Sequence, residues 1–153
     1  TLSRLRAFRK EMLQEADRAM HASGSLFEAE VTERTPVGAS EILRGSIFGE
    51  VVNVTGQEIE GRVGSPEIYA LPVEDGRQPG KWPPPGALLQ WVERVLGYTG
   101  ALAQRVEFLV RRKIGTKGTR GQHMFRDGWT ASEGRIRRIW KKLVSDVPKR
   151  HWR

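Results

Sequence analysis

The stretch YALPVEDGRQPGKWPPPGALLQWVERVLG, residues 69–97, constrains the architecture more than any other part of this chain. It holds five of the eight prolines and two of the five tryptophans. Because proline fixes φ and lacks an amide hydrogen, the run at residues 83–85 cannot lie inside a helix or a central strand. We therefore expect an anchored segment at residues 68–75, a stiff loop that carries Trp82, and an amphipathic helix at residues 87–96.

Long helices are predicted on both sides of this stretch. Apolar side chains recur every three or four residues between positions 2 and 34, which predicts one long helix that Gly24 could kink or divide. A second helix is expected over residues 101–114. A third is expected from a cap at Thr130 or Ser132 to about Val144. The inner edge predicted for the second consists of Leu102, Val106, Leu109, Val110 and Lys113, and that of the third of Ile136, Ile139, Trp140 and Leu143.

In the middle of the first half of the chain, the spacing of apolar side chains changes to the alternation typical of strands. Residues 47–55 and 58–63 are rich in β-branched side chains, and Thr55-Gly56-Gln57 between them predicts a hairpin loop. Ser40 is expected to cap a short helical turn at residues 41–44. The predicted fold is α+β: a long N-terminal helix, a small antiparallel sheet with a β-hairpin, and two or three further helices packed on it.

We expect one domain over residues 1–147 and a basic C-terminal tail over 148–153. The glycine-rich segment Gly115 to Gly121 is expected to be a mobile loop, because it lacks the order of a phosphate-binding loop and follows no predicted strand. Trp91 and Trp140 are expected in the core. Trp82 is expected to be either an interface anchor or a plug for its own loop.

Composition narrows the classes of function. The chain has no cysteine, and its three histidines, His21, His123 and His151, show no metal-ligand spacing. No serine lies in a recognisable nucleophile motif, so the sequence predicts no enzyme, no cofactor and no metal site. No apolar run approaches the ~20 residues of a membrane span. The start of the chain lacks the apolar core of a secretion signal.

The net charge of +8 is unevenly distributed. Residues 1–104 hold 11 Lys/Arg and 14 Asp/Glu, a net −3, whereas residues 105–153 hold 15 and 4, a net +11. This asymmetry indicates contact with a polyanion or an acidic partner surface, and the alternative is a solvated helix face followed by a disordered tail. The candidate contacts with DNA or with an acidic partner are Arg111, Arg112, Lys117, Arg120, Arg137, Arg138 and Lys141.

The order of short motifs resembles that of the tail-component family of long-tailed bacteriophages, also called neck or tail-completion proteins. The resemblance covers about residues 5–145. The matching residues are Thr35-Pro36-Val37-Gly38, Leu43-Arg44-Gly45-Ser46-Ile47, Tyr69-Ala70, Val73-Glu74, Gly76, Pro85, Trp91-Val92, Lys113-Ile114-Gly115-Thr116-Lys117 and Met124-Phe125-Arg126. The chain departs from the family at residues 75–80, where an aromatic and Gly-Thr-Gly are common, and at residues 121–125, where Pro-His-Pro-Phe is common.

The resemblance implies a non-enzymatic structural virion protein that joins tail to capsid. It implies a homo-oligomeric ring, a hexamer or a multiple of six, which contacts other neck, connector and tail-tube proteins and lets DNA pass. The expected location is the virion, assembled in the host cytoplasm, with no membrane contact. The candidate subunit or partner contacts are Tyr69, Val73, Glu74, Arg77, Trp82, Pro83 and Pro84. The alternative is a stand-alone basic protein that binds nucleic acid without sequence specificity.

Overall fold

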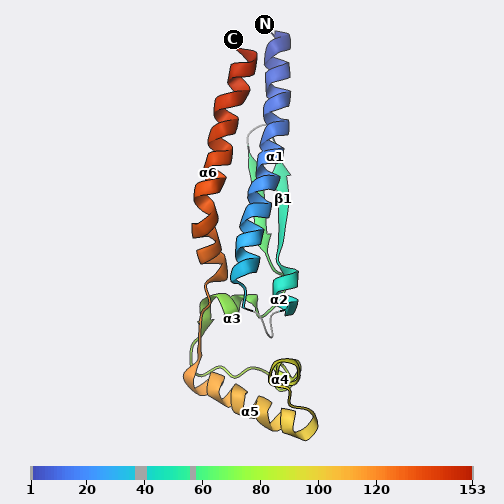
Figure 1. Ribbon diagram of the computed structural model, residues 1–153, viewed down its shortest axis with the longest axis vertical. Helices are drawn as coiled ribbons and strands as arrows, with labels where there is room; N and C mark the ends of the chain where they lie inside the picture. The colour runs from blue at the N-terminus through green and yellow to red at the C-terminus, as the bar shows by residue number, and fades with distance from the viewer. Residues whose placement is uncertain (1, 37–40, 56–57, 153) are drawn as a thin grey trace. The chain divides into compact units, whose positions relative to one another are not determined.

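The computed structural model describes residues 2–36, 41–55 and 58–152 and has an α+β fold (Figure 1). A long N-terminal helix, a small antiparallel two-stranded sheet and several further helices are present, as predicted. Where the sequence predicted one domain, the chain divides into two compact units. Unit 1 consists of Thr1–Arg34, Ile47–Gly64 and Arg126–Arg153, and unit 2 of Thr35–Ser46 and Ser65–Phe125.

Unit 1 is built on the long helix α1 (Leu2–Arg34), which passes through Gly24 without a break. Strands β1 (Phe48–Val54) and β2 (Ile59–Gly64) form the predicted antiparallel hairpin, with an irregularity in register between Val51 and Asn53. One face of the hairpin lies on α1, and the side chain of Met20 fills the space that a Cβ at Gly61 would need. The tip of the hairpin, Gly56 and Gln57, lies outside the described residues.

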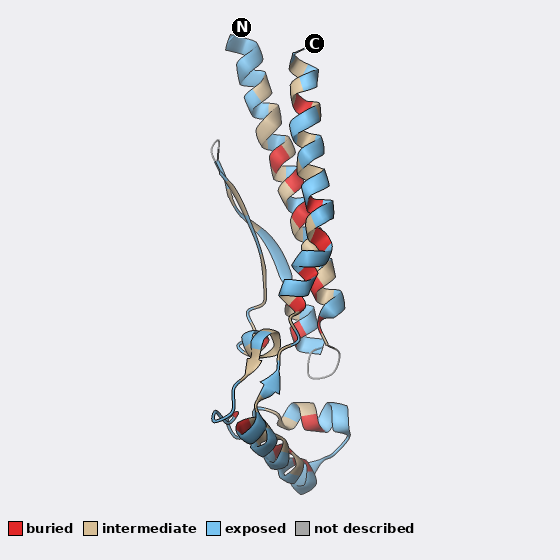
Figure 2. Cartoon of the chain, turned by 90° about the vertical axis from the view of Figure 1, so that its left-hand side faces the viewer, coloured by how far each residue is buried: buried red, intermediate tan, exposed pale blue. Residues whose placement is uncertain are grey.

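The last helix, α6 (Met124–His151), completes unit 1 beside α1 (Figure 1). Figure 2 shows that the buried positions of the two helices gather where they lie together. At this contact the indole Nε1 of Trp140 donates to Ser23 Oγ over 3.1 Å, and the rings of Phe27 and Trp129 meet edge to face at 5.5 Å. The predicted inner edge of α6 is confirmed, since Ile136 is buried and Ile139, Trp140 and Leu143 are half-buried.

Both predicted ends of this helix were wrong. It does not begin at Thr130 or Ser132, because their hydroxyls donate backward to the carbonyls of Arg126 and Trp129 inside the helix. It also continues through Pro148 to His151, so residues 148–151 are not a separate tail. A proline in a last turn removes one backbone hydrogen bond, but contacts with α1 hold this turn in place. Glu11 of α1 accepts from Arg150 over 2.8 Å and lies 2.7 Å from the His151 ring nitrogen.

Among its described residues, unit 2 contains four complete helices and a second, very short sheet. The helices are α2 (Glu41–Ser46), α3 (Ala70–Asp75), α4 (Leu89–Leu96) and α5 (Gly100–Lys117). Strands β3 (Gly76–Arg77) and β4 (Thr119–Arg120) pair antiparallel, with Gly76 opposite Arg120 and Arg77 opposite Thr119. The cap predicted at Ser40 lies outside the described residues.

The glycine-rich segment 115–121 is therefore ordered, contrary to the prediction of a mobile loop. Its glycines let two backbone segments cross at short range. A Cβ built at Gly118 would collide with the carbonyl oxygen of Arg77, and one at Gly121 with that of Glu74. Gly76 and Gly118 adopt φ of 80° and 71° with ψ of −173° and −169°, a region that other residues essentially never occupy. The glycines that indicated mobility are thus required by a close crossing of the backbone.

Candidate interaction surfaces

The proline loop lies against α5 and is fixed there by backbone and side-chain contacts. The Arg111 guanidinium donates to the Pro83 carbonyl over 2.8 Å, and the Gly80 amide donates to the Gly115 carbonyl over 2.8 Å. Pro83 is buried, whereas Pro84 is exposed. The predicted stiff loop thus gains its shape from α5 as well as from its prolines.

Trp82 is a plug for its own loop. Its indole occupies the space beside Gly115 that a Cβ there would need, and its ring centroid lies 6.2 Å from that of Phe108. The side chain nevertheless stays 44% exposed. Trp82 therefore holds the loop on α5 with one face and leaves another face open to solvent.

The candidate contacts at the start of the loop lie within the fold of unit 2. Glu74 accepts from the Phe125 amide through its carboxylate over 2.9 Å, which caps the start of α6, and the Val73 carbonyl accepts from Gln122 over 2.8 Å. Arg77 sits in β3 and is half-buried. Tyr69 is also half-buried, and burial, followed by the charge and hydrogen bond of Glu67, raises the pKa of its phenol.

The candidate basic contacts fall into two separate sets. Unit 2 carries Arg111, Arg112, Lys117 and Arg120 on α5 and β4, and unit 1 carries Arg137, Arg138 and Lys141 on α6. Two of them already have partners, since Arg111 binds the Pro83 carbonyl and Arg137 pairs with Glu133 at 2.6 Å. Within residues 2–36, 41–55 and 58–152, the other five are exposed and form no ion pair.

Helix α5 turns a different face inward from the one predicted. Ala103 and Glu107 are buried, whereas Leu109, which was predicted inside, is 58% exposed. The predicted inner edge did not include Glu107, the only carboxylate of the helix. Its carboxylate lies 3.4 Å from the Leu88 amide, near the start of α4. Val106 and Val110 of the predicted edge are half-buried, but Leu102 and Lys113 are exposed.

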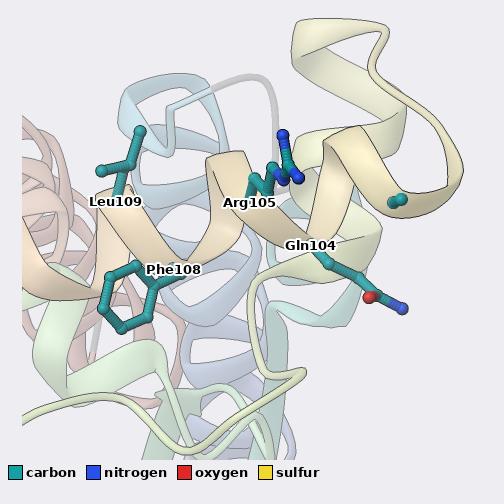
Figure 3. Close-up of a pocket in the computed structure, with 5 residues that line it drawn as sticks. Gln104, Arg105, Phe108 and Leu109 are labelled. Atoms are coloured by element: carbon teal, nitrogen blue, oxygen red, sulfur yellow. The ribbon is translucent and has the colours of Figure 1, made fainter.

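Large apolar side chains remain exposed on α4, on α5 and on the turn between them, and sequence reasoning missed this apolar surface. Its exposed large side chains are Val95, Leu96, Tyr98, Leu102, Phe108 and Leu109. Part of it forms an open hollow along one helix, in which Arg105 and Leu109 project on one side and Gln104 and Phe108 on the other (Figure 3). No carboxylate, histidine or hydroxyl lines this hollow. It therefore suits docking better than chemistry.

No metal-binding group of three His, Asp or Glu side chains occurs in the described parts of the chain. Among the same residues, no helix combines the length and the apolar character needed to cross a membrane. Comparisons of the chain with protein-family models, with characterised proteins and with solved structures give no match in any of the three.

Proposed function

We propose that this chain is a structural subunit of the head–tail junction of a long-tailed bacteriophage, in a neck or tail-completion position. It acts without a catalytic step, by assembling into a homo-oligomeric ring that joins the tail to the capsid connector and leaves a channel for DNA. Its partners are further copies of itself and other neck, connector and tail-tube proteins. Its place is the virion. The ordered series of motifs from Thr35-Pro36 to Met124-Phe125-Arg126 is the first support for this proposal.

The observation that carries the proposal is the apolar surface of α4 and α5. Between Val95 and Leu109, large apolar side chains remain exposed on two neighbouring helices. Single exposed apolar residues are ordinary, but apolar side chains that line one surface, as Ala101, Phe108 and Leu109 do on α5, mark a binding surface. A subunit that completes its burial against neighbouring copies is expected to have such a patch.

The test is the oligomeric state of the purified chain at high salt, measured by mass photometry and light scattering and imaged by negative-stain electron microscopy. High salt screens contacts between surface charges, so an apolar ring interface persists under these conditions. A closed ring with a central opening is expected. A chain that stays monomeric at every concentration contradicts the proposal.

A second candidate function is non-sequence-specific nucleic-acid binding by a stand-alone protein. It is favoured by Arg112, Lys117 and Arg120, which are exposed around the end of α5 and, within the described residues, have no carboxylate partner. Cations in such a cluster bind phosphates by releasing counterions. A monomer whose affinity for DNA falls steeply with salt supports this candidate over the ring.

A further inference from the structure

We infer that unit 2 carries two complementary docking surfaces, and that the α3 region of one copy of this chain binds helix α5 of a second copy. The inference rests on the proposed function, because it names the contact through which neighbouring subunits of the ring recognise one another. It depends only on side chains of unit 2 and on their charge and exposure.

The first surface, the α5 patch, is a stripe of apolar and basic side chains. It consists of Leu102, Arg105, Phe108, Leu109 and Arg112, all exposed. Their spacings of three and four residues place them on the half of the helix opposite the buried Ala103 and Glu107, with Arg105 and Leu109 along one edge and Phe108 along the other (Figure 3). Because Glu107 is the only carboxylate of α5 and is buried, every exposed charge on this helix is positive.

The second surface, the α3 patch, is apolar and acidic. Ile68 is 94% exposed and Leu71 is 67% exposed, values that are unusual for such side chains in a folded unit. Leu71 and Asp75 lie one helical turn apart on α3, and Asp75 is also exposed. No lysine or arginine occurs between Arg62 and Arg77, so every charged side chain of residues 63–76 is negative.

The two patches complement each other in both apolar character and charge. Leu71 and Ile68 of one copy can cover Leu102 and Leu109 of another, while Asp75 meets the guanidinium groups beside them. Complementary charges at the rim of an apolar contact favour the correct pairing over others. Because the two patches differ, the contact is heterologous, and repetition of it generates a closed ring or an open filament.

The experiment uses two single-patch variants of the full chain and one control. The α5 variant is Leu109→Ser with Arg112→Ser, and the α3 variant is Leu71→Ser with Asp75→Ser. The control is Val144→Asp, which changes an equally exposed apolar residue on α6. All of these side chains are exposed, so circular-dichroism melts are expected to match those of the unchanged chain.

Each single-patch variant is expected to self-associate at least about tenfold more weakly than the unchanged chain, as for loss of central interface residues. The control keeps its association. An equimolar mixture of the two variants is the decisive sample, because it retains one intact α3 patch and one intact α5 patch. Light scattering of this mixture should show a 1:1 heterodimer that grows no further.

The possible results separate this inference from the proposed function. Rings that persist in both variants overturn the inference and leave the ring proposal intact. Open filaments that both variants abolish support the two patches and contradict a closing ring. An unchanged chain that remains monomeric, or that binds only an added acidic amphipathic peptide, overturns both.

Discussion

At the scale of single residues, the glycines of unit 2 determine how its two loops meet. Gly76 and Gly118 lie where the backbone of residues 76–82 crosses that of residues 115–121. Both combine positive φ with extended ψ, and both lie too close to the facing backbone segment of the same chain to accommodate a Cβ. From composition alone, a glycine-rich segment is expected to be mobile, because fixing the backbone of each glycine costs conformational entropy. Here the close approach of the two backbone segments requires the conformational freedom of glycine.

Replacing Gly118 with alanine should destabilise the protein by about 1–3 kcal/mol, because alanine is strained in that backbone region and its Cβ meets the Arg77 carbonyl. The matched control is Gly134→Ala in α6, where nothing lies within 4 Å of the added Cβ. In the interior of a helix this change should stabilise by about 0.5–1 kcal/mol. Urea unfolding of the two variants measures both effects. Equal effects of the same sign would disprove the crossing.

The position of Trp82 predicts a coupling between two substitutions. Gly115→Ala alone should destabilise, because its new Cβ displaces the indole. In a Trp82→Ala background the same change should be neutral or stabilising, because the space is empty and alanine favours helix. A double-mutant cycle by urea unfolding should give a coupling energy of about 0.5–3 kcal/mol. Additive effects would show that the indole does not lie on Gly115.

At the scale of helices and strands, the sequence predicted the elements that are specified by a local pattern of side chains. Helix α1 and the hairpin β1–β2 follow from periodicity and from the proline and glycine residues at their ends. The ends of α6 do not, because Ser and Thr are favoured at caps but can also lie inside a helix when their hydroxyls donate to earlier carbonyls, as those of Thr130 and Ser132 do. The inner face of α5 also escaped prediction, because the burial of Glu107 depends on a contact with the start of α4. The exposed apolar surface was missed for the same reason.

The contacts at the end of α6 predict that the stability of the protein depends on pH. Hydrogen bonds from Arg150 and then from His151 lower the pKa of the Glu11 carboxyl, and Glu15 of α1 lies 3.9 Å from Arg150. A carboxyl whose pKa falls on folding stabilises the folded state when the pH is above its ordinary pKa of 4.5. This stabilisation is lost as the pH falls through the lowered pKa.

The Tm of the unchanged chain should therefore exceed that of Glu11→Gln near pH 6, and the difference should shrink as the pH falls below the ordinary carboxyl value of 4.5. Circular-dichroism melts at a series of pH values measure this difference. The control is Asp127→Asn, because the Asp127 carboxylate pairs with the neighbouring Arg126 at 3.0 Å and, among the described residues, forms no ion pair with α1. A difference for Glu11→Gln that persists unchanged at pH 3 would show that charge does not hold the last turn of α6 to α1.

At the scale of the whole molecule, the net charge is shared by two units that present it differently. In unit 2, the exposed cations Arg112, Lys117 and Arg120 gather around the end of α5. In unit 1, α6 carries many of the cations, and some of these are engaged by carboxylates: Arg135 pairs with Glu30 of α1, and Arg137 with Glu133. The basic last third predicted from sequence is thus two surfaces. They can be tested separately for contact with DNA and for a role in assembly.

Two triple charge reversals distinguish these surfaces: Arg112→Glu with Lys117→Glu and Arg120→Glu in unit 2, and Arg137→Glu with Arg138→Glu and Lys141→Glu in unit 1. For B-DNA, each phosphate contact contributes about −0.9 to the slope of log affinity against log salt. If unit 2 holds the phosphates, its triple variant should flatten that slope by up to about 3. The unit 1 variant should then leave it nearly unchanged, because Arg137 is already paired with Glu133.

Fluorescence anisotropy with duplex DNA over a salt series gives the two slopes, and mass photometry on the same samples reports assembly. The unit 2 variant includes Arg112 of the α5 patch, so loss of self-association by that variant alone is expected from the inferred contact. A variant with only Lys117→Glu and Arg120→Glu separates the effects, since it should bind DNA less tightly and still assemble. If reversal of Arg137, Arg138 and Lys141 abolishes assembly but leaves DNA binding unchanged, the outer side of α6 contacts a subunit and does not line a DNA channel.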